Sequence, residues 1–176
     1  MVPSVNDALL TDIASASEAR LEALRRTQLL DTPPEPAFDQ LTELACRVLR
    51  VPISFVSLLD GNREFLKSAC GLPKPWASRR EFPLSHSFSR HLVASGQPLV
   101  INDTQSHPFV RDNPALQDPG VIVYLGAPLF TPDGYMVGSL CAVDHVPRAW
   151  SEDDVGILSN LASIAMAEIA RRLGPH

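Results

Sequence analysis

The chain is poor in residues that build covalent or metal-centred sites. Its 176 residues include three cysteines and five histidines. Cys46, Cys70 and Cys141 form no close pair and no CxxC spacing, which favours reduced thiols of a cytosolic protein over a disulfide framework. His86 and His91 are too far apart in sequence to share a helix face as metal ligands at i, i+4 do. We therefore expect no metal site.

A net positive charge and long apolar runs are also missing. The formal net charge is -5, the isoelectric point is about 5.5, and Lys and Arg form no cluster, which argues against a nucleic-acid partner. No apolar run approaches the roughly 18 residues of a membrane span. The N-terminal residues lack the basic and apolar pattern of a secretory signal. These absences predict a cytoplasmic protein without a membrane span.

The overall composition is that of one globular domain. Hydrophobic residues make up 45% of the chain and charged residues 20%, which suits a protein with a full core. Residues 1–15 show no periodicity and predict a flexible lead-in. The expected domain therefore covers residues 16–173.

Two helices are predicted before the first strand. The apolar residues over 17–30 recur on one side of a helix, with charges between them. The second helix is expected to begin at Thr32 as the cap, with Pro33 at the first helical position and Glu35 completing a capping box. Its apolar positions continue at helical spacing to about Arg50.

A long closing helix is predicted over residues 152–173. Ser151 and Asp154 form a capping arrangement at its start. Its apolar residues form two stripes, a wider face than packing on one sheet requires. The second stripe indicates packing on the preceding helix, a helix-to-helix dimer contact, or both.

The predicted strands lie mostly before and after a long connecting segment of the chain, called the excursion here. Strands are expected at 51–60, 64–70 and 98–101, and in a hairpin over 120–144. The first is apolar on both faces, as in a central strand. The hairpin turns at Thr131-Pro132-Asp133-Gly134, where Pro suits the second turn position and Gly accepts a positive φ.

The segments between these strands are expected to be mostly loops. Pro-rich or turn-rich sequence predicts loops over 71–84 and 102–120. A short helix is expected between them, capped by Ser85 or Ser87 and ended by Gly96.

Five sequence blocks resemble the GAF family, in the branch attached to bacterial histidine kinases, diguanylate cyclases and phosphatases. Their order and spacing are specific as a set. The blocks are Leu30-Asp-Thr-Pro-Pro-Glu35, Val51-Pro-Ile-Ser-Phe-Val-Ser-Leu-Leu-Asp60, Pro83-Leu-Ser-His-Ser-Phe88, Gly126-Ala-Pro-Leu129 and Gly138-Ser-Leu-Cys-Ala-Val-Asp144.

The resemblance implies an α+β, PAS-like fold. A central antiparallel sheet of five or six strands in the order 2-1-5-4-3 would carry the terminal helices on one face. The long excursion, residues 84–120, would roof a ligand pocket on the other face.

The start of the excursion helix is the first candidate binding region. Ser85, His86, Ser87 and Ser89 surround an expected exposed helix N-terminus, whose free N–H groups suit an anion. The simpler interpretation is helix capping plus surface polarity, which the capping preference of Ser favours.

Further candidates lie on the roof and on the closing hairpin. Asp and Asn in the roof are explained mostly by turns, although binding groups also concentrate on loops. The remaining candidate ligand-binding residues are Asp103, Arg111, Asp112, Asn113, Tyr124 and Ser139.

The sequence therefore predicts a sensing domain without catalytic activity. It would bind an unidentified small molecule under residues 84–120 and signal through its terminal helices, as a homodimer, to a histidine kinase, cyclase or phosphatase module. The sequence leaves the cofactor unknown. One alternative is a thiol-dependent enzyme similar to free methionine sulfoxide reductase, which the absence of Cys from the roof disfavours. Another is a structural dimerisation module without a ligand. The dimer is expected to use residues 17–30, 155–173 or both.

Overall fold

One six-stranded antiparallel sheet organises the computed structural model, which describes residues 18–174; the lead-in predicted for residues 1–15 lies outside that range. The strands are β1 (Ile53–Leu59), β2 (Arg63–Cys70), β3 (Glu81–Pro83), β4 (Leu99–Ile101), β5 (Val123–Phe130) and β6 (Met136–Asp144). Their order is β3-β2-β1-β6-β5-β4. Without the short edge strand β3, this is the predicted topology, so the α+β fold class is confirmed.

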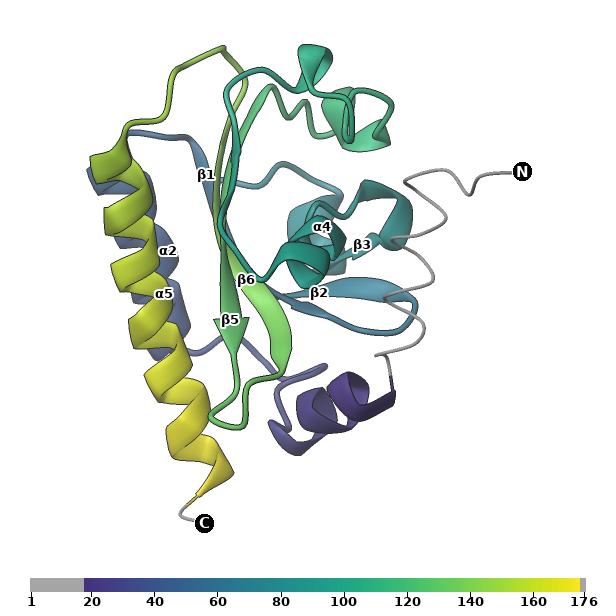
Figure 1. The fold of residues 1–176 in the computed structure, drawn as a ribbon, viewed down its shortest axis with the longest axis vertical. Helices are drawn as coiled ribbons and strands as arrows, with labels where there is room; N and C mark the ends of the chain where they lie inside the picture. The colour runs from purple at the N-terminus through teal and green to yellow at the C-terminus, as the bar shows by residue number, and fades with distance from the viewer. Residues whose placement is uncertain (1–17, 175–176) are drawn as a thin grey trace.

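Two helices cover one face of the sheet. Helices α2 (Pro36–Leu49) and α5 (Glu152–Leu173) lie side by side against it (Figure 1). Strand residues alternate between the two faces, as the pleat requires. In β6, Leu140 and Ala142 pack into the core beneath the helices, whereas Cys141 and Val143 join a second core on the opposite face.

Helix α5 begins and ends as predicted. The Ser151 side chain accepts a hydrogen bond from the Asp154 backbone N–H at 3.0 Å, and the Asp154 carboxylate accepts one from the Ser151 N–H at 3.0 Å. The reciprocal pair satisfies two backbone donors that a helix start leaves free. Leu158, Leu161 and Ile169 then point into the core beneath the helix.

Helix α2 begins later than predicted. Glu35, not Thr32, is the cap, and Pro36 takes the first helical position. Glu35 has an extended backbone, with φ -134° and ψ 137°. A residue before proline is pushed out of the helical region, and both Pro33 and Glu35 precede a proline. The Thr32 hydroxyl instead donates to the Leu29 carbonyl at 2.6 Å.

The excursion forms a second layer on the other face of the sheet (Figure 1). The segment 71–84, predicted as a loop, contains α3 (Trp76–Arg79) and strand β3. Helix α4 (Ser89–Ser95) ends at Gly96, whose φ of 66° confirms the predicted stop. One short 3-10 helix, Leu84–His86, precedes α4. Two more, Thr104–Ser106 and Pro114–Leu116, come after it.

The first predicted helix ends earlier than expected. Within the described residues it spans 18–26, and Gln28 follows with a left-handed φ of 55°. Leu24 and Leu29 are almost fully buried within the chain. The expectation that residues 17–30 expose leucines for a dimer is therefore wrong for Leu24 and Leu29, which belong to the core, whereas Leu21 is half-buried.

Three of the six exposed large apolar side chains of residues 18–174 lie on the outer helix layer, and Val100, Phe109 and Val146 lie elsewhere. Leu44 and Val48 of α2 are 39% and 46% exposed, and Ile164 of α5 is 55% exposed. Over residues 18–174, no helix has the length and hydropathy needed to cross a membrane.

Candidate functional site

A small cavity lies between the sheet and the roof segment, residues 84–120. Water-sized spheres can occupy about 20 Å³ of it, which is roughly room for one water molecule. Sheet residues form its floor and roof residues its cover. The lining consists of Ile53, Phe55, Glu64, Leu72, Phe82, His86, Phe88, Ala115, Pro119, Val121, Tyr124 and Val143.

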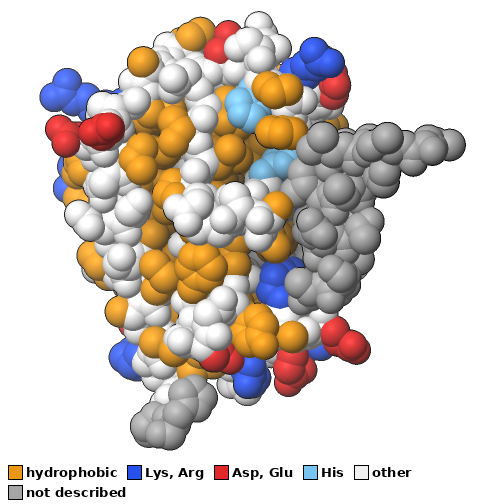
Figure 2. Space-filling view, in the orientation of Figure 1, with side chains coloured by type: hydrophobic (Ala, Val, Ile, Leu, Met, Phe, Trp, Pro, Cys, Tyr) orange, Lys and Arg blue, Asp and Glu red, His pale blue; other side chains and the backbone are white. Residues whose placement is uncertain are grey.

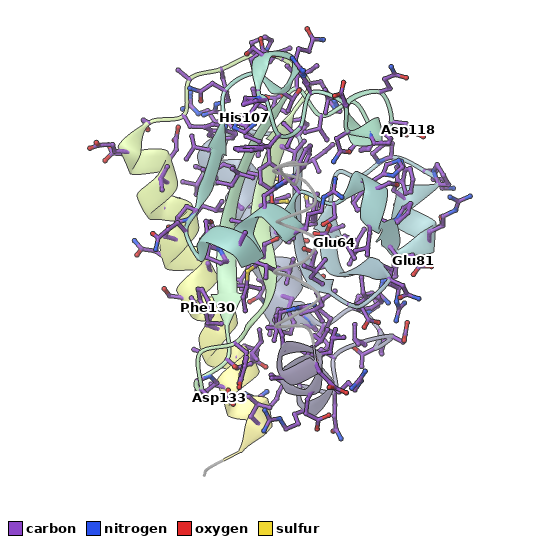
Figure 3. The ribbon with its side chains drawn as sticks, turned by 45° about the vertical axis from the view of Figure 1, so that its right-hand side comes forward. Glu64, Glu81, His107, Asp118, Phe130 and Asp133 are labelled. Carbon is purple, nitrogen blue, oxygen red and sulfur yellow. The ribbon has the colours of Figure 1, made fainter. Side chains whose placement is uncertain are left out.

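Glu64 of β2 is the charged residue of this lining. It is 2% exposed, and Figure 3 places it in the interior between the sheet and α4. Ser57 of β1 and Ser89 of α4 each donate a hydrogen bond to Glu64 Oε1, both at 2.6 Å. The hydroxyl of Ser139 on β6 lies 2.7 Å from that of Ser89 and 3.1 Å from that of Ser57. Three elements therefore supply hydroxyls behind one buried carboxylate.

The fully buried hydroxyl of Tyr124 on β5 has no hydrogen-bond partner among the described residues, and neither has the buried hydroxyl of Ser87. Burial raises the pKa of the Tyr124 phenol, so it stays protonated at neutral pH. The Tyr124 ring lies across Gly126, where a Cβ would come within 2.4 Å of the phenol oxygen. A glycine in this strand therefore makes room for the ring.

Aromatic side chains close the cavity. The Phe88 and Tyr124 rings lie 4.8 Å apart between centroids, and those of Phe55 and Phe82 lie 5.7 Å apart. His86 lies against Phe82, with nearly parallel rings. Burial lowers the pKa of His86, so its imidazole is neutral at pH 7. The walls are thus uncharged apart from Glu64.

Five of the ten predicted site residues gather at this cavity. His86 and Tyr124 line it, Ser89 and Ser139 support Glu64, and Ser87 is buried beside Phe88. The expected anion site is wrong in one respect, since the start of α4 is not an exposed N-terminus. Ser89 is fully buried, and its hydroxyl holds the protein's own carboxylate.

Three other predicted residues line a separate surface groove with a volume of about 540 Å³. They are Ser85, Asp112 and Asn113, and they share the groove with Arg90, Pro108, Phe109 and Pro114. Figure 2 shows histidine side chains beside hydrophobic ones over this part of the molecule, and His91 and His107 flank Phe109 at 6.1 and 5.7 Å between centroids. Burial lowers the pKa of His91 to about 4.

The last two predicted residues contact neither hollow. The Asp103 side chain accepts a hydrogen bond from the Gln105 backbone N–H at 3.0 Å, which is the turn role that its residue type favours. Arg111 is exposed and pairs weakly with the adjacent Asp112. Capping by Ser85 or Ser87 is also wrong, because Phe88 occupies the cap position of α4 without a side-chain hydrogen bond.

Glu64 is the site residue that sequence reasoning missed. It lies in the predicted returning strand and looked like one more polar residue there. Ser57 was the available signal, because a serine amid strand residues that are apolar on both faces needs a buried polar partner.

The cysteines are arranged differently from the sequence expectation. Cys46 of α2 and Cys70 of β2, far apart in sequence, are neighbours in space, and burial together with Cys70 raises the pKa of Cys46 to about 12. Burial also raises the pKa of Cys141, which lies inside the sheet. Over residues 18–174, no group of three or more His, Cys, Asp and Glu side chains could hold a metal ion.

Comparison with known proteins agrees with this geometry. The sequence profile of the GAF domain matches residues 33–169. A cyclic di-GMP phosphodiesterase of Pseudomonas aeruginosa is 32% identical over 143 residues, covering 80% of this chain but 24% of the relative. The chain therefore spans about a quarter of the length of that relative.

Solved structures share the fold at lower identity. The GAF domain of a phosphoenolpyruvate-protein phosphotransferase from Coxiella burnetii superposes with a TM-score of 0.66 at 20% identity, covering 86% of this chain and 93% of the other. Free methionine-R-sulfoxide reductase from Neisseria meningitidis, solved with its substrate, superposes with a TM-score of 0.61 at 18% identity, covering 90% and 93%. With a profile match over most of its length and this sheet order, the chain belongs to the GAF domain family.

Proposed function

We propose that this chain is a small-molecule-sensing regulatory domain of a bacterial signalling protein. The observation that carries the proposal is the cavity between the sheet and the roof segment, with a buried carboxylate at its wall. A concave, mostly apolar site with a few placed polar groups has the features of small-molecule pockets.

The small volume of the cavity suggests how binding would be sensed. A ligand larger than water has to displace the roof, for example at Ala115 and Pro119. A ligand shifts an equilibrium by its different affinity for the two states. A displaced roof would leave a larger cavity than the present one, so such a ligand would bind the displaced state more tightly.

Strand β2 connects the cavity to the helix layer. Glu64 lines the cavity, while the fully buried Lys67 lies on the helix side and pairs with Glu35. Glu35 also pairs with Arg172 near the end of α5. Movement of β2 would therefore reach α5 through two ion pairs.

A ligand screen with a cavity-filled control tests the sensing proposal. Differential scanning fluorimetry of a metabolite library should find compounds that raise the Tm of the unmodified protein. The variant Ala115→Leu adds a larger side chain to the cavity wall and should lose those shifts. Shifts that persist in Ala115→Leu, or a library without any hit, would contradict ligand binding under the roof.

The output module is proposed from the relative's length. The Pseudomonas phosphodiesterase matches this chain over a quarter of its own sequence, so such a domain is joined to further sequence there. We infer that residues 16–173 form one regulatory unit in the cytoplasm, acting on a kinase, cyclase or phosphatase partner.

A homodimer through the outer helix layer completes the proposal. Leu44, Val48 and Ile164 expose apolar surface on α2 and α5, whereas in the first helix Leu24 is buried and Leu21 is half-buried. Light scattering should give the mass of two chains at micromolar concentration, and Leu44→Glu with Val48→Glu should give a folded monomer. A single-chain mass for the unmodified protein would count against this assembly.

The same small volume supports a second candidate, a structural dimerisation module without a ligand. A space of about 20 Å³ can stay filled by one water molecule. This candidate predicts the dimer mass but no ligand hits, so the two experiments above separate it from the sensor.

We further propose that the domain has no catalytic activity of its own. The thiolate is the reactive form of cysteine, and the raised pKa values of Cys46 and Cys141 disfavour it. Replacing Cys46, Cys70 and Cys141 with Ala should leave ligand-induced Tm shifts intact. Thiol-dependent reduction of free methionine sulfoxide by the unmodified protein would overturn this part of the proposal.

A further inference from the structure

We propose that the cavity recognises a small organic ammonium ion, held by Glu64 and by the surrounding aromatic rings. This inference rests on the sensing function proposed above and names the chemical class of the ligand.

The first argument is the unbalanced carboxylate. Glu64 is 2% exposed, and no ion pair joins it to any cation among residues 18–174. Burying a charge without a partner is costly. Arg90 is close enough to respond to the charge of Glu64, yet forms no ion pair with it, and the Arg90 Nε is itself buried without a partner. The Glu64 carboxylate therefore has no directly paired cation among residues 18–174.

The second argument is the direction of the hydrogen bonds. Ser57 and Ser89 both donate to Oε1, and a hydroxyl has one proton to donate. Ser139 can therefore donate to either serine oxygen but receives no proton from them. Among the described residues, no donor contacts Oε2 of Glu64. One carboxylate oxygen is fixed by the protein, and the other remains available for an N–H group from a ligand.

The third argument is the chemistry of the walls. A cation is attracted to aromatic ring faces, and Phe55, Phe82, Phe88 and Tyr124 line the cavity. The unpartnered, fully buried hydroxyl of Tyr124, which lines the cavity, adds an acceptor oxygen for a further N–H group. An anion would be repelled by Glu64, and a neutral apolar molecule would leave Oε2 unpaired.

The size of the cavity limits the ligand. Its volume of about 20 Å³ accepts the ammonium group itself, and an attached alkyl chain has to enter where roof residues Ala115 and Pro119 now lie. Binding of the cation would thus open the roof, which is the movement that sensing requires.

A charge-matched ligand series on the unmodified protein tests the proposal. The probes are n-butylammonium, the neutral 1-butanol of similar length, and the anionic butyrate, each followed by isothermal titration calorimetry and by Tm. We expect butylammonium to bind at least tenfold more tightly than 1-butanol and butyrate not to bind. Equal binding of butylammonium and 1-butanol would overturn the proposal.

Two glutamate variants locate the charge that is recognised. Glu64→Gln keeps the shape and removes the charge, and it should lose at least tenfold in butylammonium affinity. Glu81→Gln is the matched control, since Glu81 lies on neighbouring β3, is half-buried outside the cavity lining, and pairs with Arg63 (Figure 3). Glu64→Gln should also fold with an unchanged or higher Tm. Equal losses of butylammonium affinity in Glu64→Gln and Glu81→Gln would contradict the inference.

The outcomes distinguish this inference from the broader function. Neutral compounds that bind in the unmodified protein and not in Ala115→Leu, without any ammonium preference, would refute the ammonium site and leave the sensor standing. Absence of any ligand that depends on Ala115 would refute both.

Discussion

Replacing Gly138 with Ala should strongly destabilise the protein, because β1 and β6 approach each other closely at this residue. Gly138 pairs with Leu58 across the two strands, and a Cβ built on it lies 1.9 Å from the Ser57 carbonyl oxygen. Ordinary contacts begin near 3.4 Å, so the β1 backbone would have to retreat by about 1.5 Å.

The magnitude follows from strain and lost strand pairing. Overpacking of a tight core costs typically about 1–3 kcal/mol. Displacing β1 at Ser57 also weakens ladder hydrogen bonds, each worth about 1 kcal/mol. The smaller entropy of the unfolded Ala chain offsets about 0.5–1 kcal/mol. We expect a net loss of about 3 kcal/mol in the free energy of unfolding, which is a change of roughly 150-fold in the folding equilibrium constant.

Equilibrium urea unfolding, followed by circular dichroism and by the fluorescence of Trp76 and Trp150, measures this loss. Gly156→Ala is the matched control. Gly156 lies on the exposed side of α5, and a Cβ there meets nothing within 4 Å. Since Ala is the better helix former, Gly156→Ala should stabilise by about 0.5–1 kcal/mol. A Gly138→Ala protein as stable as the unmodified one would refute the close-approach argument.

Three further predictions concern buried polar groups. Lys67→Met keeps the side-chain length and removes the ammonium group that pairs with Glu35. Urea unfolding should show a loss of about 2–3 kcal/mol in the free energy of unfolding. This is less than the loss expected for breaking an isolated buried ion pair, because Arg172 still pairs with Glu35. Arg172 and then Lys67 lower the pKa of Glu35 below its usual 4.5, so its contribution to stability is present above pH 4.5 and is lost as the pH falls through the lowered value. Glu35→Gln should therefore flatten the acid limb of the stability profile, and an unchanged acid limb would contradict the assignment. Tyr124→Phe removes a buried hydroxyl without a partner and should change stability by less than about 1 kcal/mol, in the stabilising direction if at all; a loss above that would reveal a hidden hydrogen bond.

Local sequence rules predicted the elements that depend on neighbouring residues. The Ser151 capping box fixed the start of α5, and Gly134, with a φ of 91°, closes the hairpin as its residue type requires. The same rules failed where two local signals competed. At Thr32 to Pro36 a capping pattern coincided with three prolines, and the steric effect of proline on the preceding residue decided the helix start.

The candidate site was predicted only in part, because it depends on strand pairing and not on neighbouring residues. Ser89 and Ser139 were identified as site residues, but the partner that explains them, Glu64, was not. The pairing of β1 with β2 and β6 decides which residues meet, and nothing in the spacing of these residues along the chain shows it.

The sequence by itself determined most helices, strands and turns, because hydrophobic periodicity, caps and turns act over a few residues and can be read from one segment at a time. The order of the main strands followed only from the resemblance of five sequence blocks to the GAF family. The tertiary structure decided the rest: the burial of Leu24, the proximity of Cys46 and Cys70, the volume of the cavity and the isolation of the Glu64 carboxylate. These properties depend on which segments pack against each other in three dimensions, and burial and unsatisfied hydrogen bonds exist only after that packing is complete.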